Sequence, residues 1–151
     1  AQQRIDYYAS LNSPWTHLGA ARIEALAAEH GAGLRIWPVD FGTIFAGSGG
    51  LPLPKPSPQR PAYRMQELAR WRDRPGDPAT LSALLAECGQ DAEAVLRLGA
   101  EPRWAERREA DTRAALARGV FGAPSYVIGD EIFWGQDRLE FVAERLARGA
   151  A

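Results

Sequence analysis

The sequence predicts an α/β fold, and three observations support that prediction. A strand-like run, a helix-like run and a second strand-like run follow one another over residues 4–41. Several short helical patterns fill the middle of the chain, and two strand-like runs precede a last helical pattern over residues 125–148. With 151 residues, 46% of them hydrophobic, the chain is long enough to bury one core as a single domain spanning residues 1–151.

The N-terminal part is predicted to form a strand–helix–strand unit. RIDYYAS alternates and is rich in β-forming residues, which favours a strand. Ser13 can cap the next helix, and Pro14 suits the first helical position, where its missing N–H costs nothing. The apolar stripe of this helix consists of Leu18, Ile23, Leu26 and Ala27. LRIWPVDF is a second strand, so the unit implies a parallel pair with a right-handed crossover.

The middle of the chain combines a Gly/Pro-rich stretch with a helical block. FGTIFAGSGGLPLPKPSPQ predicts a long ordered loop or lid, with an interdomain linker as the alternative. Helical patterns follow in RPAYRMQELARWRD, DPATLSALLAECG, DAEAVLRLG and EPRWAERREADTRAALARG. They predict a helical insertion at about residues 61–118.

The C-terminal part predicts a hairpin and a helix. SYVIG and EIFWG flank a Gly-Asp turn, which is a strong hairpin signal. The helical pattern QDRLEFVAERLA then has a core-facing stripe of Leu139, Phe141, Val142 and Leu146. The predicted order is β-α-β, helical block, β-β-α.

Charge and cysteine content narrow the function classes. The net charge of −1 predicts no nucleic-acid partner, although basic residues gather between Lys55 and Arg74. Such a patch suits a small anionic ligand, and a solvated helix face is the alternative. A single cysteine, Cys88, excludes a disulfide framework and a Cys-x-x-Cys pair, and its helical context predicts a small buried hydrophobe. No signal-peptide layout or bilayer-length apolar run is present, which predicts a cytoplasmic protein without a membrane partner.

The element order and four sequence motifs resemble those of a known family. The element order, with a Pro directly before the third strand, resembles the thioredoxin fold, and the inserted helices resemble its DsbA-like branch. SPWTHLG, ELARW, GVFGAPSYVIGDE and FWGQDRLEFV resemble the 2-hydroxychromene-2-carboxylate isomerases, relatives of the kappa-class glutathione transferases. The resemblance covers about residues 4–74 and 78–148.

Two features depart from that family. RWRDRPGDPATL passes directly where relatives carry more helix, so either the protein has lost part of the block or the sequence lacks a stretch of it. Gly49-Gly50 also stands where relatives often place an Asn that contacts the cofactor.

The resemblance implies that glutathione is the cofactor and Ser13 the catalytic residue. Ser13 stands where redox relatives carry the first Cys of Cys-x-x-Cys, so dithiol exchange is excluded here. A serine hydroxyl at a helix N-terminus can instead donate a hydrogen bond to the thiolate of glutathione. The alternative is that Ser13 is only an N-cap. A Ser13–His17 hydrolase is disfavoured because no G-x-S-x-G elbow surrounds the serine.

Further residues are assigned to glutathione and substrate by the same resemblance. Ala123-Pro124 implies a cis bond whose backbone pairs with the cysteinyl part, with a trans Pro starting a strand as the alternative. Gln136 and Asp137, at a helix N-terminus, are assigned to the γ-glutamyl end. Arg60 is assigned to the glycyl carboxylate, with Lys55 as a less favoured substitute. Trp15 and Phe45 are assigned to a flat substrate, and the alternative is that they belong to the core.

The predicted function is a glutathione-dependent cis/trans isomerase of the 2-hydroxychromene-2-carboxylate type. Its substrate would be a small unsaturated, aromatic-derived acid. The alternatives are a kappa-like glutathione transferase and a catalytically idle thioredoxin-like binding protein. Two histidines and one distant cysteine predict no metal site. Dimers are common among such folds, so a homodimer is the one macromolecular partner considered.

Overall fold

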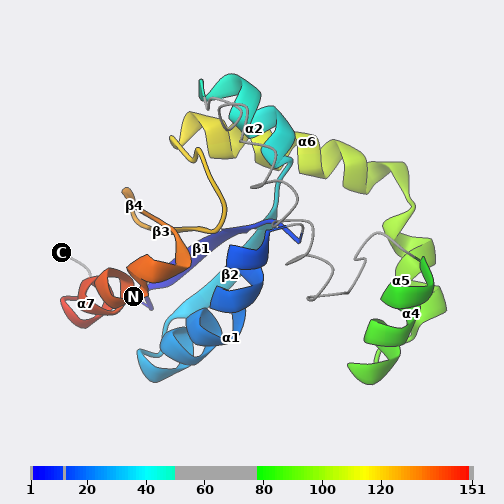
Figure 1. The fold of residues 1–151 in the computed structure, drawn as a ribbon, viewed down its shortest axis with the longest axis horizontal. Coiled ribbons are helices and arrows are strands. Elements are labelled where there is room, and N and C mark those ends of the chain that lie inside the picture. The colour runs from blue at the N-terminus through cyan, green and yellow to red at the C-terminus, as the bar shows by residue number, and fades with distance from the viewer. Residues whose placement is uncertain (1, 12, 50–77, 150–151) are drawn as a thin grey trace, which may run out of the picture. The chain divides into compact units, whose positions relative to one another are not determined.

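A computed structural model describes residues 2–11, 13–49 and 78–149 (Figure 1). The chain divides into two compact units, one of residues 1–50 with 108–151 and the other of residues 51–107. In the second unit the structure describes α4 (Pro78–Glu87) and α5 (Ala92–Gly99). Helix α6 (Pro102–Ala117) begins in that unit and ends in the first. The first unit holds the whole sheet.

The sheet has four strands in the order β2-β1-β3-β4. β1 (Arg4–Ala9) pairs in parallel with β2 (Gly33–Pro38) and antiparallel with β3 (Ser125–Ile128). β3 continues into the antiparallel β4 (Glu131–Trp134) through a turn in which Gly129 has φ 63°. The predicted parallel unit and the predicted hairpin are both confirmed.

Helices cover both faces of this sheet (Figure 1). Strand side chains alternate between the faces, so Tyr7 and Tyr8 enter different cores. On one face, α1 (Pro14–Glu29) and α7 (Leu139–Ala147) close a core of Ile5, Tyr7, Ile23, Ala27, Tyr126, Ile128, Leu139, Val142 and Leu146. On the other face, α2 (Phe41–Gly47) and the end of α6 close a core of Tyr8, Val39, Phe41, Ile44, Ala115, Val120 and Val127.

Two predicted stripe positions are wrong. Leu18 is 44% exposed and Phe141 is 50% exposed. The buried positions of α7 follow a three- and four-residue spacing at Leu139, Val142 and Leu146. Phe141 lies one residue off that spacing and therefore faces away from the core.

Two other expectations are also wrong. The first residues of the expected loop at 41–59 form α2, because the Asp40 carboxylate accepts hydrogen bonds from Gly42 N at 3.1 Å and Thr43 Oγ1 at 2.8 Å. The rest of that stretch beyond residue 49 and the helical pattern at 61–74 lie outside the described residues. Cys88 is exposed rather than buried, because α4 ends at Glu87 and leaves it in the following turn.

A buried carboxylate links the strands to the end of α6. Asp6 on β1 is 3% exposed, and its Oδ2 and Oδ1 accept hydrogen bonds from Arg118 Nη1 at 2.8 Å and Trp37 Nε1 at 3.0 Å. Burial opposes ionisation of this carboxyl, but the hydrogen bonds from Arg118 and Trp37 and the contributions of Arg4 outweigh it. The pKa of Asp6 is therefore lowered below its ordinary value.

Among the helices that the structure describes, none combines the length and apolar character needed to cross a bilayer.

Candidate active site

Most of the predicted site residues lie at one edge of the sheet, the edge formed by the ends of the strands. Because β1 and β2 are parallel and β3 runs against β1 and β4, the ends of β1, β2 and β4 meet the start of β3. The segments at this edge carry Ser13 and Trp15 after β1, Phe45 after β2, Ala123 and Pro124 before β3, and Gln136 and Asp137 after β4. All of them belong to the first unit.

Ser13 is the N-cap of the 16-residue helix α1. It has an extended backbone, and its Oγ accepts a hydrogen bond from Thr16 N at 3.4 Å. That bond uses a lone pair of Oγ and does not consume the hydroxyl hydrogen. Thr16 also anchors the first turn of α1 to β1 and the segment after it. Tyr7 Oη donates a hydrogen bond to the Thr16 carbonyl at 3.3 Å, and Ser10 N donates one to Thr16 Oγ1 at 3.3 Å. The cap and the proposed hydrogen-bond donor are thus compatible roles for one hydroxyl.

Two buried tyrosines lie beneath this helix. The rings of Tyr7 and Tyr126 stack with centroids 5.1 Å apart. Burial, with a smaller contribution from Glu24, raises the pKa of Tyr7 to about 12, and burial raises the pKa of Tyr126 further. Both remain protonated at neutral pH, so neither serves as a general base there. Within the described residues, Tyr126 Oη is buried without a hydrogen-bond partner.

The loop before β3 is held from both sides. The Ala123-Pro124 bond is cis, as the resemblance implied, and Pro124 is buried. Pro124 O accepts a hydrogen bond from Gly135 N at 2.9 Å. Ser125 Oγ donates to Gly122 O at 2.6 Å. These bonds fix the half-buried Ala123 backbone at the sheet edge.

The turn after β4 differs from the expected helix N-terminus. Residues Gln136–Arg138 form a 3₁₀ turn, η1, and α7 begins only at Leu139. No side chain, that of Asp137 included, caps either element. Asp137 is exposed, and its Oδ2 lies 3.2 Å from Arg138 Nη1. The 3₁₀ turn leads directly into α7, so Gln136 and Asp137 lie at the start of the combined helical segment.

The aromatic residues at the edge are exposed. Trp15 is 57% and Phe45 46% exposed, so the alternative that they belong to the core is wrong. A second pair was missed: the rings of Phe121 and Trp134 meet edge to face at 5.0 Å. A Cβ on Gly122 would overlap the Trp134 indole, so this glycine lets the pair sit against the loop before Pro124. The segments GVFGAP and IFWGQ each place an aromatic residue beside a site motif, and this pattern could have predicted the pair.

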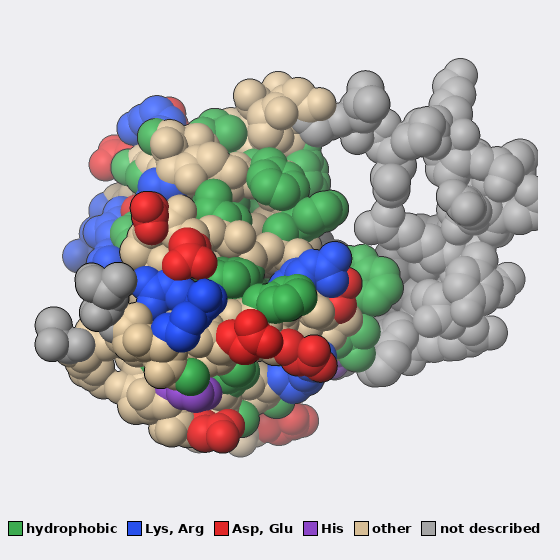
Figure 2. Space-filling model, turned by 90° about the vertical axis from the view of Figure 1, so that its left-hand side faces the viewer, with side chains coloured by type: hydrophobic (Ala, Val, Ile, Leu, Met, Phe, Trp, Pro, Cys, Tyr) green, Lys and Arg blue, Asp and Glu red, His purple; other side chains and the backbone are tan. Residues whose placement is uncertain are grey.

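Arg60 and Lys55 lie outside the described residues, as does the basic stretch that contains them. On the face drawn in Figure 2, acidic, basic and hydrophobic side chains are interspersed.

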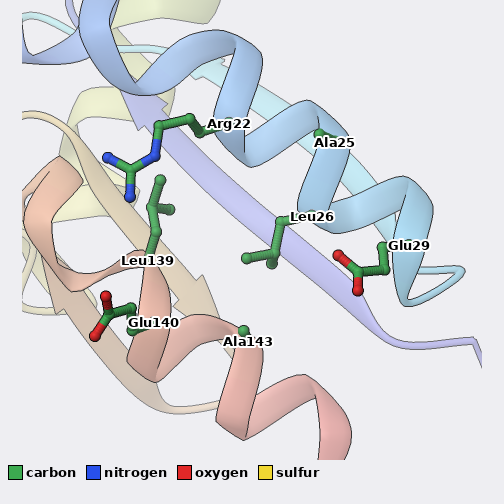
Figure 3. Close-up of a pocket in the computed structure, with 7 residues that line it drawn as sticks. All are labelled: Arg22, Ala25, Leu26, Glu29, Leu139, Glu140 and Ala143. Atoms are coloured by element: carbon green, nitrogen blue, oxygen red, sulfur yellow. The ribbon is translucent and has the colours of Figure 1, made fainter.

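A shallow groove of about 320 Å³ lies between α1 and α7 (Figure 3). It is lined by Arg22, Ala25, Leu26, Glu29, Leu139, Glu140 and Ala143. None of the predicted site residues lines it.

Gly19 allows α1 to approach the turn after β4. A Cβ at this position would lie 2.8 Å from Tyr126 Oη and 2.9 Å from Gln136 Cβ. We expect Gly19→Ala to lower the free energy of unfolding by about 1–3 kcal/mol through overpacking, although Ala favours helix by about 1 kcal/mol. Urea unfolding measures this.

Gly99→Ala is the matched control, because a Cβ on this helical glycine meets nothing within 4 Å. It should be neutral or stabilising. Equal unfolding midpoints for the two variants would contradict the close approach at Gly19.

Comparison with known proteins defines the class. The family model of the DSBA-like thioredoxin domain matches residues 4–76 and 72–147. The chain belongs to the DsbA-like thioredoxin domain family.

Within that class the similar proteins carry one name. A 2-hydroxychromene-2-carboxylate isomerase of Sphingobium xenophagum is 29% identical over 191 residues, which covers 94% of this chain and 97% of the relative. A protein of the same name from Pseudomonas sp. (strain C18) is 25% identical over 193 residues, covering 97% and 91%. These comparisons confirm the resemblance found in the motifs.

Solved structures agree on the fold. A 2-hydroxychromene-2-carboxylate isomerase matches with a TM-score of 0.75 at 22% identity, covering 96% of this chain and 95% of that chain. A thioredoxin-like oxidoreductase from Silicibacter pomeroyi DSS-3 matches with a TM-score of 0.63 at 21% identity, covering 99% and 88%.

The alignment with the Sphingobium relative also bears on chain length. It runs over 191 positions, whereas this chain has 151 residues, so at least 40 positions have no counterpart here. The two matched segments of the family model meet at residues 72–76, within RWRDRPGDPATL. Both observations agree with a helical block that is shorter in this sequence than in the relative, and they fit equally a lost part of the block and a stretch that the sequence lacks.

Proposed function

We propose that the protein is a glutathione-dependent cis/trans isomerase of the 2-hydroxychromene-2-carboxylate type, acting on an unsaturated, aromatic-derived acid. The observation that carries the proposal is Ser13, a hydroxyl that caps α1 at the same sheet edge as the cis-Pro124 loop. Three relatives named 2-hydroxychromene-2-carboxylate isomerase, 24–29% identical over nearly the whole chain, support an isomerase.

The residues at the edge fit a peptide thiol. When bound, glutathione supplies a thiolate that adds reversibly to an unsaturated acid, so that the double bond becomes single, rotates and reforms on elimination. A thiol with an ordinary pKa near 8.5 is mostly protonated at neutral pH. The Ser13 hydroxyl and the N-terminus of α1 both favour the charged form, because each presents positive partial charge to it.

The other residues bind and orient. The backbone of Ala123 is available to pair with the extended cysteinyl part. Gln136 and Asp137 bind the γ-glutamyl end, and Arg60 binds the glycyl carboxylate. The exposed rings of Trp15, Phe45, Phe121 and Trp134 provide apolar surface at this edge for a flat substrate.

Glutathione titration followed by product analysis tests the proposal. We expect saturable binding of glutathione at or below millimolar concentration, and catalytic conversion of a 2-hydroxychromene-2-carboxylate without net consumption of glutathione. A stable conjugate formed one for one with glutathione would make the protein a transferase. No saturable binding would make it an idle binding domain. Both outcomes overturn the isomerase.

A further inference from the structure

Arg22 makes a specific contact with a residue of the proposed glutathione site. It lies on α1, and its Nη1 donates to Gln136 Oε1 at 2.7 Å and to Gln136 O at 3.3 Å. Figure 3 shows the side chain reaching from α1 toward the start of α7 at Leu139. A guanidinium on α1 thus holds both oxygens of a residue 114 positions away in the chain.

This contact fixes the hydrogen-bonding character of Gln136. A glutamine side chain offers one acceptor oxygen and one NH₂ group with two donors. Since Arg22 binds the oxygen, the NH₂ group is the part left for a ligand. Gly19 permits this contact between α1 and Gln136, because the absence of a Cβ lets α1 lie close to Gln136 and to Tyr126 Oη.

Asp137 complements this donor with an acceptor. Its exposed carboxylate accepts hydrogen bonds only, whereas the Gln136 amide beside it is left to donate. A donor next to an acceptor matches the carboxylate and the ammonium of a free α-amino acid end. Among the parts of glutathione, the γ-glutamyl residue is the one that carries both groups.

We infer that Arg22 is a positioning residue that makes Gln136 a hydrogen-bond donor and so selects thiols carrying a γ-glutamyl end. The inference rests on the proposed function. It assigns the selectivity to the orientation of the Gln136 side chain, which Arg22 sets from α1.

The test compares two thiols on three variants by isothermal titration. Glutathione carries the γ-glutamyl end, and cysteinylglycine does not. In Arg22→Met, which keeps the stem and removes the donors, glutathione should bind about 10-fold more weakly while cysteinylglycine changes less than about 2-fold. Arg22→Lys should fall between Arg22→Met and the parent, because it keeps the charge and loses the fork. Arg113→Met, at an exposed pair with Glu109 on α6, is the control and should change neither ligand.

Gln136→Glu separates this role from a purely structural one. It gives Arg22 a charged partner and removes both amide hydrogens, so the fold should be at least as stable while glutathione affinity falls about 10-fold or more. Equal losses for both thiols in Arg22→Met, or unchanged glutathione affinity in Gln136→Glu, would overturn the inference and leave the proposed isomerase activity standing. A parent protein that binds no glutathione would overturn both.

Discussion

Replacing Ser13 by Ala is expected to slow isomerisation by about 10- to 100-fold at neutral pH and to leave glutathione affinity nearly unchanged. The hydroxyl is proposed to donate a hydrogen bond to the thiolate, and such a bond to a charged acceptor contributes about 1.5–3 kcal/mol. One pKa unit corresponds to about 1.36 kcal/mol, so the bound thiol should titrate about one to two units higher. The rate should recover as pH rises, because α1 still presents its N-terminus. A pH profile of kcat measures this.

Two substitutions at the same position separate catalysis from capping. Ser13→Ala also removes the bond to Thr16 N, which should cost about 1 kcal/mol of stability. Ser13→Asp keeps an N-cap acceptor but carries no hydroxyl hydrogen and adds negative charge. It should fold well and be nearly inactive, whereas Ser13→Thr should keep most of the activity. An active Ser13→Asp enzyme, or a covalent adduct between Ser13 and substrate, would show that thiolate stabilisation is not its role.

Arg118→Met is expected to lower the free energy of unfolding by about 3 kcal/mol. Arg118 donates to Asp6 Oδ2 at 2.8 Å, to Tyr8 Oη at 3.1 Å and to Gly129 O at 2.9 Å. The Asp6 side chain is 5% exposed, so its charge would stay buried without the guanidinium. Removing one partner of a buried pair costs about 3–5 kcal/mol. Arg118 is 34% exposed and Arg4 remains 3.1 Å from Asp6, which favours the lower end. Urea unfolding at neutral pH measures the loss.

The pH dependence of the free energy of unfolding tests the contribution of the Asp6 carboxylate. Because the pKa of Asp6 is lowered in the folded state, its contribution is full above the unfolded value of about 3.9 and is lost as pH falls through the folded value. The parent should therefore lose stability below about pH 4, and Asp6→Asn should lack that part of the decline. An unchanged acid profile in Asp6→Asn, or a loss in Arg118→Met no larger than in the surface control Arg113→Met, would contradict this account.

Local patterns in the sequence predicted most of the elements. Alternation and β-branched or aromatic residues identified the strands, and the Gly-Asp pair placed the turn at Gly129. Helix α2 was missed because it spans only residues 41–47 and includes two glycines. Its signal was present in Asp40, which caps it, and in the spacing of Phe41 and Ile44, which are buried.

Contacts between distant segments were not predictable from one sequence. Arg22 meets Gln136 across 114 residues, and Arg118 meets Asp6 across 112. These pairs depend on strand register and on how each helix sits against the sheet, which no local period encodes. The N-cap at Ser13 was predicted correctly from Ser-Pro chemistry, and the cis Ala123-Pro124 bond from the family resemblance. The 3₁₀ turn at Gln136–Arg138 was not, because the helical pattern of QDRLEFVAERLA runs through it.

Titration of the bound glutathione thiol tests the central claim most directly. Thiolate absorbance is followed against pH in saturated complexes of the parent protein and of Ser13→Ala. We predict a bound thiol pKa below the ordinary value near 8.5 in the parent, and a value about one to two units higher in Ser13→Ala. Identical titrations in the two proteins would contradict the role assigned to Ser13.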